Sequence, residues 1–206
     1  MVTIKLYVEG GGDSNDLRTR CRRGFAELLR KVGLEGRMPR IVACGSRGNA
    51  YQDFRTAISQ AGADEFPVLL VDSEAPVGQV SDSWNHLRTK DGWERPADAA
   101  EEHAHLMVQC MEAWFLSDKD CLAVFYGQGF YVNALPQRSD IENVPKADVL
   151  DALRNATRHT RTKGEYRKGT HSFDLLARID PERVRGASPH ADRFFATLIR
   201  KANERP

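Results

Sequence analysis

Two hydrophobic periods alternate along the chain. Short runs of apolar residues, some alternating with polar ones, predict strands at residues 4–8, 38–44, 66–71 and 103–110. Apolar residues spaced by three and four positions predict helices at residues 16–32, 50–61, 118–125, 145–158, 172–179 and 189–202. The order β-α-β-α-β, followed by a further strand and more helices, predicts an α/β fold with a central, mostly parallel sheet and flanking helices.

The pattern also predicts how the chain is divided. Residues 1–116 are expected to form the α/β core, and residues 117–206 a helical, basic C-terminal extension packed on it. A loop-rich insertion is expected at about residues 75–100, where prolines and glycines leave room for one short helix near 81–87. Residues 180–181 are predicted to link the last two helices.

The first predicted strand runs into an acidic, glycine-rich turn. Glu9 follows the strand directly, three glycines come next, and Asp13 then precedes the first helix. Open α/β sheets bind ligands at this edge. The turn lacks the G-x-G-x-x-G and Gly-Lys-Ser/Thr patterns of phosphate loops, and its carboxylates would repel a phosphate. Because carboxylates can hold a divalent cation that in turn holds the phosphate, we favour a metal site over a solvated turn.

Further acidic residues are predicted at the ends of later strands. The third strand, FPVLLV, has the apolar character of a central strand covered on both faces, and it ends at Asp72 with Glu74 two residues later. If the backbone stays extended, both carboxylates point the same way. Glu112 lies just past the fourth predicted strand. In that strand His103 and His105 share a face, and such a pair could bind zinc. We favour this zinc site less than the carboxylate metal site.

Composition sets the broad class of protein. Of the 206 residues, 41% are hydrophobic and 29% are charged, which suits a globular domain, and the formal net charge is +1. No apolar run approaches the ~20 residues that span a bilayer, and the chain starts without a signal-peptide pattern. The four cysteines show no CxxC spacing, so we expect reduced thiols in a cytoplasmic protein with no membrane association. Residues 151–206 hold 13 Lys and Arg against 7 Asp and Glu, a balance suited to a polyanionic partner.

The motifs VEGGGD, at Glu9, and LLVDSE, at Asp72, resemble those of the Toprim fold of topoisomerases, primases and OLD-type nucleases. In that family a Glu after the first strand is followed by Gly, and a D-x-D motif ends a later strand. The resemblance covers roughly residues 1–115 and departs at Glu74, which replaces an Asp. The run GEYRKGTHSFDLLARIDPERV is similar to an uncharacterised Toprim-like bacterial family encoded near ATPase genes in defence loci. The resemblance implies an anti-phage effector nuclease that works with an ABC/SMC-type ATPase partner.

The resemblance also implies roles for individual residues of a nuclease that uses Mg²⁺ or Mn²⁺. The metal would be bound by Glu9, Asp13, Asp72, Glu74 and Glu112. Catalysis would involve Glu9, Asp72, Glu74, Lys168 and His171. The last two of these would neutralise the phosphate or protonate the leaving group. Nucleic acid, either DNA or RNA, would be contacted by Arg158, Arg161, Lys163, Arg167 and Lys168.

Two other functions fit the same pattern. The replacement of Asp by Glu74 favours, slightly, a non-catalytic Toprim-like regulatory or assembly subunit of an ATPase complex. The same acids would also serve a phosphohydrolase or phosphotransferase of small molecules. The excess of basic residues at 151–206 favours a polymeric substrate over a small one. The sequence leaves the number of metal ions and the oligomeric state open.

Overall fold

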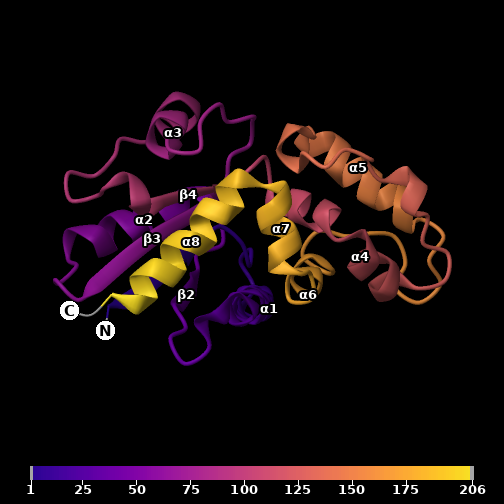
Figure 1. Cartoon of the computed structure of the whole chain (residues 1–206), viewed down its shortest axis with the longest axis horizontal. Coiled ribbons are helices and arrows are strands. Elements are labelled where there is room, and N and C mark those ends of the chain that lie inside the picture. Colours follow the sequence, from indigo (N-terminus) through magenta and orange to yellow (C-terminus); the bar gives the residue numbers. More distant parts are fainter. Residues whose placement is uncertain (1, 205–206) are drawn as a thin grey trace.

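Four parallel strands form the centre of the molecule in the order β2-β1-β3-β4 (Figure 1). The computed structural model describes residues 2–204. The strands are β1 (Thr3–Val8), β2 (Arg40–Ala43), β3 (Glu65–Asp72) and β4 (Ala104–Met107). The longest strand, β3, lies between β1 and β4 and is buried from Phe66 onward. The predicted α/β class, with a parallel central sheet and flanking helices, is confirmed.

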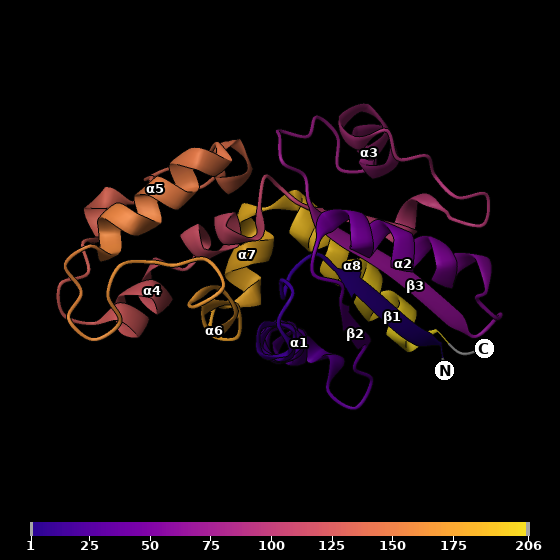
Figure 2. The same ribbon diagram turned by 180° about the vertical axis from the view of Figure 1, so that it is seen from behind.

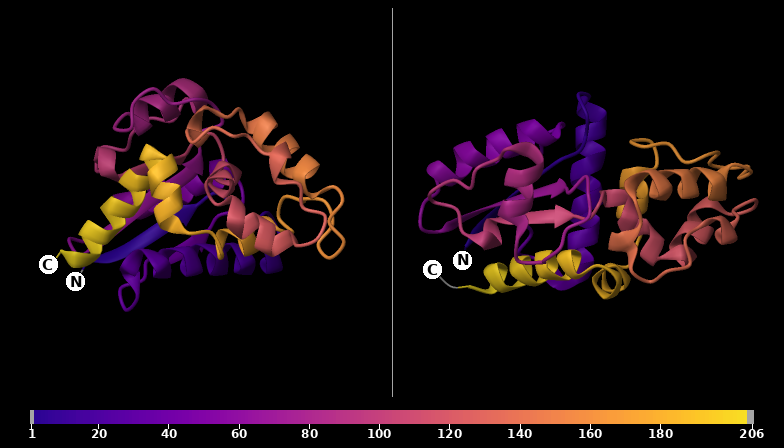
Figure 3. Two further views of the ribbon diagram at one scale, coloured as in Figure 1. Left: turned by 45° about the vertical axis from the view of Figure 1, so that its right-hand side comes forward. Right: turned by 90° about the horizontal axis from the view of Figure 1, so that it is seen from above.

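Helices cover both faces of the sheet and continue beyond the carboxyl ends of its strands (Figures 1 and 3). Around the sheet lie α1 (Asn15–Leu29), a π-helical turn (Arg30–Leu34), α2 (Arg47–Ser59), α3 (Ser83–Asp91) and α8 (Pro189–Asn203). Toward and beyond the strand ends lie α4 (Lys119–Tyr126), α5 (Lys146–Thr157), α6 (Ser172–Leu176) and α7 (Pro181–Ala187). Short 3₁₀ turns lie at Glu101–His103, Met111–Ser117, Val132–Ala134 and Ile141–Asn143.

Alternating side chains of β3 divide the apolar core into two layers. Val68 and Leu70 belong to the layer that contains α1 and α8, whereas Leu69 and Val71 belong to the layer that contains α2 and α3. Figure 1 shows α8 in front of the sheet, and Figure 2 shows α2 in front of it from the opposite side. The first layer continues without interruption into apolar residues of α4, α5, α6 and α7. The domain boundary expected near residue 116 stays a prediction.

Basic residues of α1 and the π-helical turn hold α6 in place. Arg23 Nη2 lies 2.5 Å from Asp174 Oδ1, and Arg20 Nη2 lies 3.3 Å from Asp174 Oδ2. The Lys31 ammonium donates to the carbonyl oxygens of residues 177–179, just past the end of α6, at 2.7–3.0 Å. The helix dipole favours a cation at that end. These three side chains therefore bind the C-terminal part of the chain itself.

Residues 180–181 begin a helix, so the prediction that they only link two helices was wrong. The Asp180 carboxylate accepts a hydrogen bond from the Glu182 backbone N–H at 2.9 Å, and Pro181 occupies the first turn of α7. The seven residues of α7 are too few for an apolar repeat to show in the sequence. The strand predicted at 103–110 is also shorter than expected, because β4 ends at Met107.

The two histidines near β4 are bound by the protein backbone. His103 Nδ1 lies 2.7 Å from the Pro67 carbonyl oxygen, and His105 Nε2 lies 3.1 Å from that of Glu102. Burial, followed by the charge of Arg193 3.5 Å from Nδ1, lowers the pKa of His105 to about 3. Within residues 2–204, no histidine joins a group of three potential metal ligands. The zinc alternative therefore gains no support.

Acid is expected to weaken the fold through His105. In the unfolded chain this imidazole takes up a proton below about pH 6.5, whereas in the folded protein it stays neutral down to about pH 3. The stability that the folded protein gains from the neutral His105 is complete above about pH 6.5. Below that pH this gain in the free energy of unfolding is lost by about 1.4 kcal/mol per pH unit. Between pH 7 and pH 5, urea unfolding should therefore show about 2 kcal/mol more loss of stability in the wild type than in His105→Gln.

The exposed His159 provides the control. His159→Gln should lose as much as the wild type, and an equal loss in His105→Gln would contradict the assignment.

Candidate metal centre

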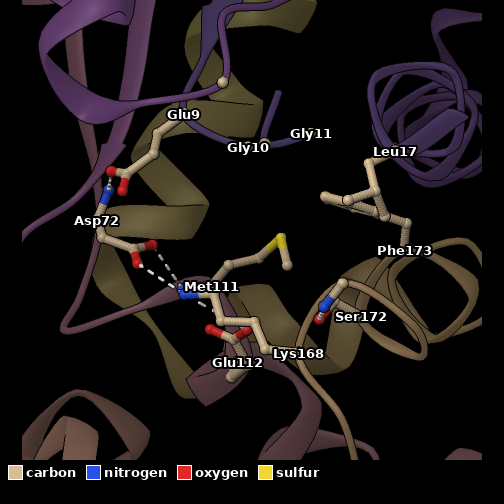
Figure 4. A pocket seen from close by; sticks show the side chains of 13 residues that line it. Glu9, Gly10, Gly11, Leu17, Asp72, Met111, Glu112, Lys168, Ser172 and Phe173 are labelled. Atoms are coloured by element: carbon tan, nitrogen blue, oxygen red, sulfur yellow. Dashed lines mark hydrogen bonds and ion pairs between the residues drawn. The ribbon is translucent and has the colours of Figure 1, made fainter. Parts of the chain in front are cut away.

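Three carboxylates meet at the carboxyl edge of the sheet, and Figure 4 shows two of them, Glu9 and Asp72. Glu9 follows β1 and Asp72 ends the neighbouring β3, and the Asp72 backbone N–H donates to Glu9 Oε2 at 3.1 Å. One carboxylate oxygen each from Glu9, Asp72 and Glu74 lies within 4.8 Å of the other two. The convergence expected from parallel strand ends is confirmed, and we call these three residues the carboxylate triad.

Glu74 reaches the triad through a left-handed backbone. Its φ is 59°, a conformation that costs a residue with a side chain about 1–3 kcal/mol. The backbone N–H groups of Ser73 and Glu74 donate to the carbonyl oxygens of Met107 and Gln109, at 3.0 and 2.9 Å. The backbone therefore does not stay extended from Asp72 to Glu74, and the two carboxylates converge through this turn instead.

Two cations that the sequence patterns did not single out contact the triad. Lys146 Nζ, at the start of α5, lies 2.5 Å from Glu74 Oε1 and 3.3 Å from Asp72 Oδ2. Arg47, at the start of α2, donates to the Asp72 carbonyl oxygen, and its Nη1 lies 3.7 Å from Glu9 Oε2. The one sequence signal for Lys146 is its place in the first turn of the helix predicted at 145–158, whereas Arg47 precedes the helix predicted at 50–61.

Asp72 lies at the centre of these charges. Its side chain is 5% exposed, and its Oδ1 accepts a hydrogen bond from the Met111 backbone N–H at 2.8 Å. Burial, followed by repulsion from Glu9 and Glu112, raises the pKa of Asp72 to about 7. Burial also raises the pKa of Glu9 despite the opposing charge of Arg47. Ionised carboxylates at these positions therefore need a positive charge beside them.

Glu112 adds a fourth carboxylate close to Asp72. It is fully buried in the 3₁₀ turn after β4, and its Oε1 accepts a hydrogen bond from the Tyr166 hydroxyl at 3.0 Å. Lys168 Nζ lies 3.7 Å from this oxygen and 4.0 Å from Asp72 Oδ2. The other oxygen, Glu112 Oε2, is buried and has no hydrogen-bond partner within the described chain. Such a group is costly unless a ligand pairs with it.

A cavity of about 290 Å³ opens beside the carboxylates. Figure 4 shows Leu17 and Phe173 across the cavity from the acidic side chains, and the glycine turn of residues 10–12 forms another part of its wall. Gly11 has a φ of 87°, and a Cβ there would lie 2.8 Å from the Arg18 Cα. The turn therefore requires glycine, and its bare backbone leaves space beside the triad.

Two predicted site residues are not brought to this cavity. Asp13 is exposed and lies outside both the triad and the cavity lining. His171 is also outside the lining, and its Nδ1 lies 3.1 Å from the Tyr126 hydroxyl and 3.3 Å from the Arg167 backbone nitrogen. Burial lowers the pKa of His171. The structure gives His171 a place in the packing around Tyr126 and no contact with the site, which corrects its expected position beside the reacting phosphate.

The basic segment, residues 158–168, lies mostly outside the cavity. Arg158, Arg161 and Arg167 are exposed, and the Lys163 ammonium lies 4.8 Å from the centre of the Phe125 ring. Of the five residues predicted to contact nucleic acid, Lys168 alone lines the cavity. The other four lie outside its lining, and their binding role stays a prediction.

Comparison with known proteins gives a family. A family model described as a domain of unknown function, DUF4276, matches residues 8–199. No curated protein and no solved structure matches the chain. Within the described part of the chain, no helix has the length and apolarity needed to cross a membrane.

Proposed function

The chain belongs to the DUF4276 family, and we propose that it is a Mg²⁺- or Mn²⁺-dependent nuclease that cleaves nucleic-acid phosphodiesters. The observation that carries this proposal is the carboxylate triad, with three ligand oxygens within 4.8 Å beside a cavity at the carboxyl edge of a parallel sheet. Hard divalent cations prefer such oxygen ligands.

The residues present fit a divalent cation. Glu9, Asp72 and Glu74 would hold it, and the unpartnered oxygen of buried Glu112 would hold it directly or through water. A cation would also relieve the repulsion among Asp72, Glu9 and Glu112 that raises the pKa of Asp72. When bound, a divalent metal polarises the phosphodiester and stabilises the leaving oxygen.

The chain itself would orient the substrate and exclude water. The Met111 N–H fixes the direction of the Asp72 carboxylate, and the glycine turn leaves room for a phosphate to approach the backbone. Lys168, on the cavity wall, would donate to a phosphate oxygen and neutralise its charge. Leu17 and Phe173 on the opposite wall would limit the access of water to the site.

We further propose that the nuclease acts in the cytoplasm, in anti-phage defence, with an ABC/SMC-type ATPase partner. This part rests on the resemblance of the VEGGGD and LLVDSE motifs to the Toprim fold and of the C-terminal run to a defence-associated family. The exposed basic segment supports a nucleic-acid partner. All four cysteines are free thiols, as a reducing compartment requires.

A non-catalytic assembly subunit is the second candidate. The Lys146 ammonium already forms ion pairs with Asp72 and Glu74, so the triad could persist as a structural ion-pair network without metal. This candidate would use the basic segment to bind the ATPase or its nucleic acid.

Metal-dependent stability and cleavage test the proposal together. If Mn²⁺ binds the folded protein alone, a concentration 100 times the dissociation constant should stabilise it by about 2.7 kcal/mol, measured as a rise in melting temperature. Plasmid DNA, a single-stranded oligonucleotide and tRNA should then be assayed for cleavage with Mn²⁺ and with EDTA, with and without an ABC/SMC-type ATPase as candidate partner. Stabilisation without cleavage of any of these substrates would leave the metal site in place and overturn the nuclease. The absence of both effects would overturn the metal site and favour the assembly subunit.

A further inference from the structure

The carboxylate triad already has a cation supplied by the protein. Lys146 Nζ lies 2.5 Å from Glu74 Oε1 and 3.3 Å from Asp72 Oδ2, and both residues belong to the triad. Magnesium and similar ions approach carboxylate oxygens to about 2.0–2.6 Å. An ion bound to Asp72 and Glu74 would therefore stand in the space that the ammonium uses.

The position of Lys146 is built into the fold. A buried glutamine, Gln109, accepts a hydrogen bond from the Lys146 backbone N–H through its Oε1, at 3.4 Å, and donates through Nε2 to the Glu142 carbonyl oxygen, at 3.2 Å. The Gln109 carbonyl oxygen accepts the Glu74 backbone N–H at 2.9 Å. One residue thus ties the start of α5 to the strained backbone of Glu74. This arrangement fixes the lysine and its carboxylate partner relative to each other.

We infer that Lys146 is the resident cation of the site and that it competes with the divalent metal; this inference rests on the proposed function. A positive charge this close repels an incoming divalent ion strongly, since the pair is only partly exposed to solvent. Metal entry requires the ammonium to leave. The position of α5, which carries Lys146, therefore sets the affinity of the triad for the metal. Because α5 leads directly into the basic segment at Arg158, a nucleic acid that binds this segment and moves the helix would admit the metal.

Calorimetric titration of the full chain with Mn²⁺ tests the competition. Lys146→Gln removes the charge and should bind Mn²⁺ at least about tenfold more tightly than the wild type. Lys146→Arg keeps the charge and should retain the wild-type affinity. Lys119→Gln is the matched control, because Lys119 also begins a helix but donates to the Pro136 carbonyl oxygen, at 2.6 Å, and not to a carboxylate. It should bind Mn²⁺ as the wild type does.

The outcomes separate this inference from the proposed function. Equal Mn²⁺ affinity in wild type and Lys146→Gln would overturn the competition and leave the metal site in place. Absence of Mn²⁺ binding in every variant would overturn both. Binding by Lys146→Gln alone would support the competition in its strongest form. Lys146→Met, which keeps the aliphatic stem, provides a second neutral variant if Lys146→Gln does not give a native circular dichroism spectrum.

Discussion

Replacing Asp72 by Asn is expected to abolish both the Mn²⁺-dependent rise in melting temperature and metal-dependent cleavage, while the fold is retained. The amide oxygen can still accept the Met111 N–H bond now made by Oδ1, so the turn after β4 keeps its anchor. The lost negative charge is the one that Glu9 and Glu112 repel, so the metal-free variant should melt at the wild-type temperature or above it. Melting curves with and without Mn²⁺ and a cleavage assay measure both effects.

Two further variants make this result specific. Glu9→Gln should lose the same two responses, because Glu9 provides another oxygen of the triad. Asp151→Asn, at an exposed position paired with Arg154 within α5, should keep both. A full Mn²⁺ response in Asp72→Asn would show that the ion binds elsewhere.

Reversing three charges of the basic segment should remove most of the affinity for nucleic acid. Arg158, Arg161 and Lys163 are exposed, and if each neutralises one phosphate, their change to Glu should reduce the slope of log K against log salt by about three. The affinity of the triple variant should therefore be low at low salt and should depend less steeply on salt than that of the wild type. Fluorescence anisotropy with a labelled oligonucleotide from about 50 to 200 mM salt measures the slope.

A control of equal charge separates this effect from net charge alone. Arg55, Arg88 and Lys90 are exposed on α2 and α3, and their reversal also replaces two Arg and one Lys. This variant should keep the wild-type slope. If the basic-segment variant binds as tightly as the wild type, the segment contacts solvent or a protein partner instead.

The positions of the strand ends were predictable from the sequence. The local apolar periodicity gives the bounds of each strand, and parallel pairing brings the ends to one edge of the sheet. β1 and β3 lie within about two residues of the predicted runs, and parallel neighbours present their carboxyl ends at one edge. That placed Glu9 beside Asp72 from the sequence alone. The left-handed backbone of Glu74 was not predictable, because it depends on bonds to Gln109 and Met107 in a distant segment.

The cations of the site could not be found from local patterns. Lys146 is separated from Asp72 by 74 positions, and its contact depends on how α5 is placed against the sheet edge. Conversely, the Toprim resemblance implied a catalytic role for His171, but its ring lies among the aromatic rings of Phe125, Tyr126 and Tyr166. Sequence proximity to charged residues gave no information about which way its ring would face.

Arg20, Arg23 and Lys31 bind α6 through Asp174 and the carbonyl oxygens of residues 177–179. These contacts have a consequence for how this protein can evolve. The helix that follows the acidic glycine turn holds α6, and α6 in turn supplies Phe173 to the cavity wall. A gene rearrangement that exchanged only the C-terminal half for that of a relative would have to replace these partners at the same time. The two halves should therefore be inherited as one unit, and viable chimeras should need crossover points outside the interval from α1 to α6.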